Sequence, residues 1–169
     1  MTKRILLIGG PGCGKSSLIL ELERLGEYII KESAEDVIRL EQAKGTLKPW
    51  TKNNFQEKIL KLQIQREKNI PKNIERVFID RGIPDGLAYI KSSSHAARLI
   101  KNAIKRYNKI FFIENLGTTE KNKIRKENFK QAIKLENKIK RIYESLGYKL
   151  EIIKPADVNQ RVKDLLSRL

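Results

Sequence analysis

The stretch Gly9-Gly10-Pro11-Gly12-Cys13-Gly14-Lys15-Ser16 decides how this chain folds. It matches the pattern G-x-x-x-x-G-K-[ST], with a short apolar run before it and an apolar helical pattern after it. A strand, a glycine-rich loop and a helix in this order indicate a loop that wraps around phosphate groups. The backbone N–H groups of such a loop and the N-terminus of the helix present partial positive charge to an anion. The alternative is a glycine-rich turn that binds no ligand.

This loop predicts a nucleotide site in which the residues have separate roles. We expect Lys15, as a solvated loop lysine, to reach the β- and γ-phosphates, and the Ser16 hydroxyl to bind Mg²⁺. Cys13 has no partnering base in the sequence, so we do not expect it to act as a nucleophile, although a thiol near a helix N-terminus is easily oxidised. The expected nucleotide-binding residues are Gly10, Pro11, Gly12, Cys13, Gly14, Lys15, Ser16 and Ser17.

Strand-like and helix-like patterns alternate along the whole chain. Short apolar, β-branched runs predict strands at Arg4–Ile8, Tyr28–Ile30, Arg76–Ile79, Ile110–Ile113 and Lys149–Ile153. A 3.6-residue periodicity predicts helices at Lys15–Leu25, Ala34–Lys44, Phe55–Asn69, Pro84–Lys91, Ala96–Tyr107, Asn128–Leu146 and Asp157–Leu169. The alternation predicts an α/β fold with a parallel sheet and helices on both faces, and ligands beyond the carboxyl ends of the strands. With no linker and no repeat, we expect residues 1–169 to form a single domain.

Composition narrows the possible partners. Thirty-six Lys and Arg against 20 Asp and Glu leave a net charge of +16, which attracts anions without identifying them. No apolar run approaches the roughly 20 residues that cross a bilayer. The first apolar segment is too short for a signal peptide, so we expect a cytoplasmic protein without membrane contact. One cysteine and one histidine exclude an internal disulfide and a Cys/His zinc site.

A second acidic and basic pair follows the third predicted strand. Val77-Phe78-Ile79 ends in Asp80, and Arg81-Gly82 comes directly after it. A carboxylate at such a strand end meets the metal or its water shell, and the arginine can fork onto phosphate oxygens. We predict that Asp80 and Arg81 are catalytic and that Asp80, with Ser16, is at the metal. The sequence leaves open whether Asp80 acts as a general base or in the metal shell. The alternative is a structural ion pair in a loop.

The chain resembles a known family over nearly its whole length. The runs GGPGCGKSS, KESAEDVIRLEQAKGTLKPW, NFQEKILKLQIQRE, VFIDRGIPDGLAYI and ESLGYKLEIIKP, in this order, look like the AAA-type P-loop family of predicted ATPases or nicotinamide-riboside-kinase-like proteins. That family is related to the nucleoside and nucleotide monophosphate kinases. The resemblance implies a three-layer P-loop NTPase fold with strand order 2-3-1-4-5, ATP or GTP with Mg²⁺, and a lid at about residues 115–128.

The resemblance also implies an acceptor side of the crevice. A Glu after the second strand lies there in the family, and Glu32 matches it. Glu35 stands where the family has an arginine, which places a phosphate-bearing acceptor in doubt, although Arg39 can substitute. Trp50 can stack on a base or another aromatic group. The alternatives are a solvated helix cap for Glu32 and loop packing for Trp50.

The segment from Lys121 to Arg141 carries nine Lys and Arg against two Glu. In the related kinases this is the lid, and the family's arginine shortly before the long helix matches Arg125. We predict that Arg125 is a catalytic arginine that stabilises charge on the transferring phosphoryl group. The alternative is a solvated helix face. The resemblance makes Arg161 a weak candidate for contact with a purine. The lone His95 follows three serines in a polar stretch, so we expect it to be exposed and not catalytic.

Three functions remain open from the sequence. The first is a P-loop phosphotransferase that moves the γ-phosphoryl group of ATP or GTP to a small-molecule or nucleotide acceptor with Mg²⁺. The second is an NTPase or NTP-dependent switch with water as the acceptor. The third, a nucleic-acid-associated ATPase, is not favoured, because no helix-turn-helix or RNP pattern occurs and only 7% of residues are aromatic.

Overall fold

A computed structural model of the chain describes residues 2–90, 97, 100, 106–117 and 123–169, and the side chains of 123–130 lie outside this description. The strands are β1 (Lys3–Ile8), β2 (Tyr28–Ile30), β3 (Arg76–Asp80), β4 (Lys109–Ile113) and β5 (Leu150–Ile153). The α-helices are α1 (Lys15–Arg24), α2 (Ser33–Ala43), α3 (Phe55–Lys68), α5 (Lys123–Ser145) and α6 (Val158–Ser167). Two 3₁₀ helices, η1 (Pro49–Thr51) and η2 (Ile83–Ala88), complete the set that is described.

The five strands form one parallel sheet in the order β2-β3-β1-β4-β5. This confirms the predicted fold class and strand order. β1 lies in the centre, with β3 and β4 as its neighbours, and Leu7 of β1 pairs with Asp80 of β3. The phosphate loop after β1 and the acidic end of β3 therefore meet at the same edge of the sheet.

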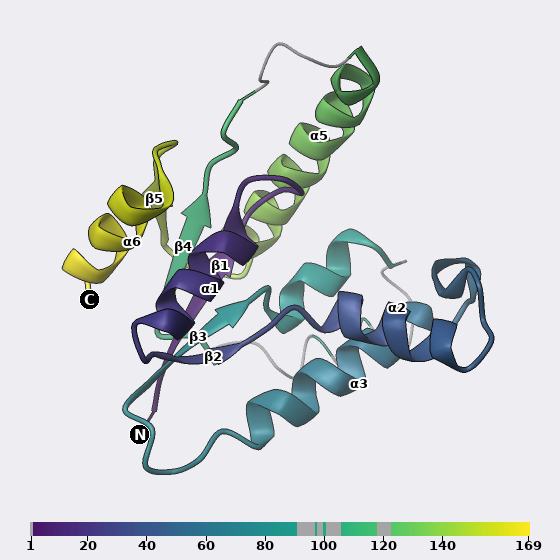
Figure 1. Cartoon of the computed structure of the whole chain (residues 1–169), viewed down its shortest axis with the longest axis horizontal. Coiled ribbons are helices and arrows are strands. Elements are labelled where there is room, and N and C mark those ends of the chain that lie inside the picture. The colour runs from purple at the N-terminus through teal and green to yellow at the C-terminus, as the bar shows by residue number, and fades with distance from the viewer. Residues whose placement is uncertain (1, 91–96, 98–99, 101–105, 118–122) are drawn as a thin grey trace.

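Helices cover both faces of the sheet, because the central strands are apolar on both sides. Ile5 and Leu7 of β1 pack with α1 and α6 on one face. Leu6 and Ile8 point to the other face, where they meet Ile139 and other residues of α5. Figure 1 shows α1 and α6 together on one side of the sheet, while α2 and α3 extend away from β2. The result is the three-layer arrangement that the alternating pattern predicts.

Some predicted helices differ from the observed ones. The pattern at Pro84–Lys91 forms the short 3₁₀ helix η2 instead of an α-helix. Helix α5 begins at Lys123, five residues before the predicted start, so the backbone of Arg125 lies in its first turn rather than before it. The predicted helix Ala96–Tyr107 lies mostly outside the described residues, as does His95. In the part of the chain that is described, no helix is both long and apolar enough to cross a membrane.

Candidate active site at the carboxyl ends of β1 and β3

The phosphate loop joins β1 to α1 in the conformation that its glycines predict. Gly12 has a φ of 75°, and Gly14, which precedes α1, has a φ of 87°. Both lie in the left-handed region, which side chains with a Cβ avoid. Pro11, Gly12, Ser16 and Ser17 are exposed, so the outer surface of the loop and the first turn of α1 are open to a ligand.

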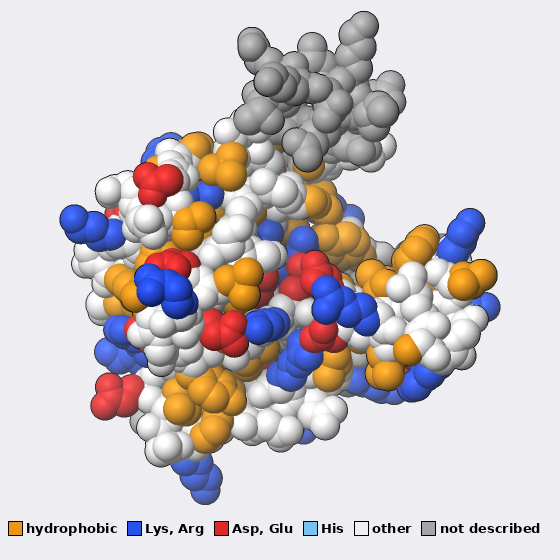
Figure 2. All heavy atoms as spheres, in the orientation of Figure 1, with side chains coloured by type: hydrophobic (Ala, Val, Ile, Leu, Met, Phe, Trp, Pro, Cys, Tyr) orange, Lys and Arg blue, Asp and Glu red, His pale blue; other side chains and the backbone are white. Residues whose placement is uncertain are grey.

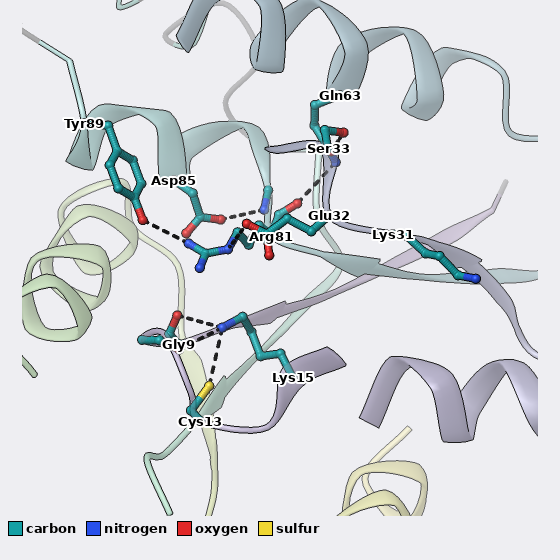
Figure 3. Close-up of polar contacts among 12 residues, drawn as sticks. Gly9, Cys13, Lys15, Lys31, Glu32, Ser33, Gln63, Arg81, Asp85 and Tyr89 are labelled. Carbon is teal, nitrogen blue, oxygen red and sulfur yellow. Dashed lines mark hydrogen bonds and ion pairs between the residues drawn. The ribbon is translucent and has the colours of Figure 1, made fainter. Parts of the chain in front are cut away.

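Lys15 is not a solvated loop lysine, as the sequence suggested, but is only 5% exposed. Its ammonium group donates hydrogen bonds to the carbonyl oxygens of Gly9, at 3.0 Å, and Gly10, at 2.9 Å. It also lies 3.4 Å from the Cys13 thiol (Figure 3). Cys13 itself is fully buried, so the expected easy oxidation of this thiol is not supported. The lysine carries its charge into the interior of the loop.

Two side chains from distant helices hold the loop in place. Arg161 of α6 is 2% exposed and donates hydrogen bonds to the carbonyl oxygens of Cys13, at 2.8 Å, and Glu114, at 3.0 Å. Its guanidinium is thus a brace between the loop and the end of β4, and not the base contact that the sequence suggested. On the other side Glu136 of α5 is buried against Gly10, where an added Cβ would lie 2.8 Å from the Glu136 carboxylate.

Asp80 ends β3 beside the phosphate loop and is 3% exposed. Burial raises the pKa of its carboxyl to about 6, against the opposing charge of Lys15. One carboxylate oxygen, Oδ1, is buried without a hydrogen-bond partner among the described residues. An unpartnered buried carboxylate oxygen next to a phosphate loop fits Mg²⁺, which takes one or two protein ligands together with phosphates and water. Ser16 and Asp80 are therefore suitable to hold the predicted metal ion.

Glu32 and Arg81 form an ion pair across the crevice. The backbone of Arg81 has a φ of 64°, so this residue adopts a left-handed conformation directly after β3. Its Nε lies 2.9 Å from Oε1 of Glu32, and its Nη1 donates to the Tyr89 hydroxyl at 3.1 Å. Burial opposes the charged form of Arg81, but Glu32, Tyr89 and Asp85 outweigh that effect and raise its pKa. Figure 3 shows Glu32, Tyr89 and Asp85 converging on this one guanidinium.

Glu32 occupies the N-cap position of α2, but its side chain makes no capping hydrogen bond. The helix-cap alternative therefore does not account for its side chain, which turns toward Arg81 instead.

Asp85 is a site residue for which the sequence analysis proposed no role. It is 4% exposed, accepts a hydrogen bond from the Gly82 N–H at 2.6 Å and another from the Tyr143 hydroxyl at 3.2 Å. Burial raises its pKa, and the Arg81 charge opposes this rise. The signal was present in Asp80-Arg81-Gly82-Ile83-Pro84-Asp85, because Asp three positions after Gly82 can close a capping box.

A cavity of about 180 Å³ opens beside the Glu32–Arg81 pair. Its polar end consists of Glu32, Ser33, Arg81 and Asp85. The opposite wall is apolar and comes from α2, α3 and η2, with Ile38, Phe55, Ile59, Leu60 and Ile83 among its residues. The cavity can therefore hold a small molecule with one polar end and an apolar or aromatic body.

Two other predicted site residues, Arg39 and Trp50, do not line this cavity. Arg39 is on the exposed side of α2, 3.6 Å from Glu35, and does not line the cavity. Trp50 is 52% exposed in η1 and is also outside the lining. In Figure 2 hydrophobic side chains are exposed at the right-hand end, where α2 and the loop after it lie in Figure 1. The Arg125 side chain lies outside the described residues.

Comparison with solved structures shows the same fold in several kinases. Deoxyadenosine kinase from M. mycoides, solved with the products dCMP and dCDP, is 17% identical, with a TM-score of 0.65 and coverage of 98% of this chain and 97% of that one. Thymidylate kinase from Ehrlichia chaffeensis is 16% identical, with a TM-score of 0.65 and coverage of 99% and 98%. NadR in complex with NAD and AMP-PNP is 17% identical, with a TM-score of 0.71, but this chain corresponds to only 49% of its length.

No curated protein matches the chain. A model of the AAA domain, however, matches residues 4–161. This span includes the phosphate loop, the Asp80–Asp85 segment and Arg161, which are the residues that build the site described above. The chain therefore belongs to this AAA domain family, and it shares its fold with several nucleoside and nucleotide kinases.

Proposed function

We propose that this protein is a P-loop phosphotransferase that moves the γ-phosphoryl group of ATP or GTP to a hydroxyl or phosphate group of a small acceptor. The observation that carries the proposal is the cavity beside the Glu32–Arg81 ion pair, whose lining combines these two charged side chains with apolar ones. Hydrolysis by water requires no such organic pocket. A phosphotransferase needs one, because its acceptor must be held in line with the phosphoryl group.

The residues of the phosphate loop serve the nucleotide in this proposal. Backbone N–H groups of residues 10–17 contact phosphate oxygens, and Lys15 exchanges loop carbonyls for the β- and γ-phosphates. Ser16 and Asp80 would hold Mg²⁺, which neutralises charge on the phosphates. The buried Asp80, with a pKa of about 6, remains largely ionised at neutral pH and suits this role.

The acceptor side is assigned to Glu32 and Arg81. Glu32 lines the cavity, and the ion pair with Arg81 fixes its orientation. A carboxylate held in this way accepts the hydrogen bond of an acceptor hydroxyl and takes its proton as the oxygen attacks phosphorus. Arg81 holds the Glu32 carboxylate in place through their ion pair and places positive charge next to the transferring group. Arg125, near the start of α5, is proposed to add a second positive charge over the phosphoryl group.

An acceptor screen tests this assignment. ATP and GTP are incubated with Mg²⁺ and single candidates drawn from the similar structures: deoxyadenosine, thymidylate, NR and shikimate. We expect the release of ADP or GDP to rise with one of these acceptors. Phosphorus NMR should then show equal amounts of the nucleoside diphosphate and the phosphorylated acceptor. Glu32→Gln should abolish transfer while nucleotide affinity changes less than about threefold. Phosphate release at the same rate with and without every acceptor supports the NTPase alternative instead.

A further inference from the structure

Behind the acceptor cavity lies a buried carboxylate that contacts neither the cavity nor the phosphate loop. The side chain of Glu67, in the last turn of α3, is fully buried. Its Oε1 accepts hydrogen bonds from the Tyr107 hydroxyl, at 2.9 Å, and from Nε2 of Gln63, at 3.1 Å. The Arg4 guanidinium lies 3.7 Å from the other oxygen, Oε2. A carboxylate is costly to bury, and the partners of Glu67 show which part of the structure it stabilises.

Both hydrogen bonds of Glu67 lead to the turn after β3. Tyr107 gives its only proton to Glu67, so its oxygen is free to accept the Ile83 N–H, at 2.8 Å. Gln63 accepts the Ser33 hydroxyl at its oxygen, so its amide group is free to donate to Glu67 and to the Arg81 carbonyl, at 3.2 Å. Two relays from one carboxylate thus end on the residues on either side of Gly82.

This turn needs support because its conformation is unfavourable. Arg81 has a left-handed backbone with a φ of 64°, a conformation that is costly for a residue with a Cβ, and in this conformation its Nε lies 2.9 Å from Oε1 of Glu32. Gly82 has no room for a side chain, since an added Cβ would lie 2.5 Å from the Tyr143 hydroxyl and 2.9 Å from that of Tyr107. The tyrosines therefore pack directly against the turn. The Tyr107 hydroxyl binds its backbone at the Ile83 N–H, whereas the Tyr143 hydroxyl donates to the Asp85 carboxylate.

We propose that Glu67 is a positioning residue of the acceptor site, which holds the turn of residues 81–83 through Tyr107 and Gln63 and thereby keeps Arg81 against Glu32. The inference rests on the proposed function for its effect on catalysis. The hydrogen-bonded relay itself does not depend on that function.

Three variants test the relay. Tyr107→Phe removes a single oxygen, whereas Glu67→Gln keeps an acceptor oxygen and serves as the conservative rescue. Glu27→Gln is the control, because Glu27 is a partly buried carboxyl that, like Glu67, lies against an arginine: its partner is Arg76, at the opposite end of β3. Amide hydrogen exchange is measured at Ile83, in the turn after β3. Val77, within β3, is the reference that reports global unfolding.

We expect Ile83 to exchange at least about tenfold faster in Tyr107→Phe, while Val77 changes no more than it does in Glu27→Gln. The exchange rate of Ile83 in Glu67→Gln should lie between the rates in the wild type and in Tyr107→Phe. If Tyr107→Phe does not fold, Glu67→Gln is compared with Glu27→Gln in its place. With the acceptor that the wild type phosphorylates, kcat/KM should be about tenfold lower in Tyr107→Phe than in the wild type. The affinity for a non-hydrolysable ATP analogue should be unchanged.

The outcomes separate the two proposals. Unchanged exchange at Ile83 in both relay variants overturns the inference, whatever the protein catalyses. Faster exchange at Ile83 with an unchanged kcat/KM shows that the relay is only structural and also overturns it. Failure of the wild type to phosphorylate any acceptor refutes the proposed function, whereas the exchange result still decides whether Glu67 holds the turn.

Discussion

Replacement of Arg161 by Ala distinguishes a brace of the phosphate loop from a residue that touches only the nucleotide. The guanidinium donates to the carbonyl oxygens of Cys13, at 2.8 Å, and Glu114, at 3.0 Å, and is 2% exposed. Each carbonyl that loses its partner in a buried place costs about 1–3 kcal/mol. Part of this cost is offset, because the variant no longer has to bury a charged guanidinium. We therefore expect a loss of about 2–4 kcal/mol in the free energy of unfolding.

The assay is urea denaturation followed by circular dichroism, with thermal unfolding in parallel. For a chain of this size a loss of 2–4 kcal/mol lowers Tm by roughly 4–16 °C. Arg24→Ala is the control, because Arg24 forms an exposed i,i+3 ion pair with Glu21, and we expect a change within about 0.5 kcal/mol. A stability of Arg161→Ala equal to that of the control, together with weaker nucleotide binding, would refute the brace and restore the interpretation as a base contact.

Three further predictions concern the charges of the site. Lys15→Ala should reduce nucleotide turnover below detection in a coupled ADP assay, and turnover near the wild-type rate contradicts the loop assignment. The same variant should lower the free energy of unfolding by about 1–3 kcal/mol in urea denaturation, since it leaves the Gly9 and Gly10 carbonyls unpaired. Because the pKa of Asp80 is raised from 3.8 to about 6, the folded state binds more protons than the unfolded state between these values, so this residue's contribution to stability is present at low pH and is lost as pH rises through about 6. Between pH 4.5 and 7.5 the free energy of unfolding of Asp80→Asn should therefore rise by about 2 kcal/mol relative to that of the wild type. Parallel curves for the two proteins would show that Asp80 has no raised pKa. Labelled duplex DNA should bind only weakly at physiological salt and should not stimulate ATP turnover, despite the net charge of +16; several-fold stimulation would favour the nucleic-acid hypothesis.

The sheet and the phosphate loop follow from local patterns in the sequence. All five predicted strands lie within one residue of the observed strands, because parallel strands buried on both faces are continuous apolar runs. The loop follows from its glycines and from its position between a strand and a helix. The helix at Val158 was also predictable, since Asp157 accepts the Gln160 N–H as a cap, as the spacing of these residues indicates.

The supports of the site could not be predicted from such patterns. Arg161, Glu136 and Glu67 act on backbone groups or on side chains that are far from them in sequence, and a contact of this kind leaves no periodic signal. The burial of Lys15 depends on the carbonyls of its own loop turning inward, which the motif alone does not specify. The early start of α5 at Lys123 was missed because the sequence there is polar and basic and shows no apolar periodicity before Asn128.

The support that Arg161 gives to the loop also has a consequence for how the protein is made. The phosphate loop is complete in sequence once Ser16 has been synthesised, but the carbonyl of Cys13 is held by a residue 148 positions later. The central strand β1 likewise pairs with β3 and β4, which leave the ribosome long after it. Contacts of such long sequence separation form late in folding. We therefore expect a nascent chain that ends before α6 to present an unbraced loop and to bind a nucleotide more weakly than the folded domain does.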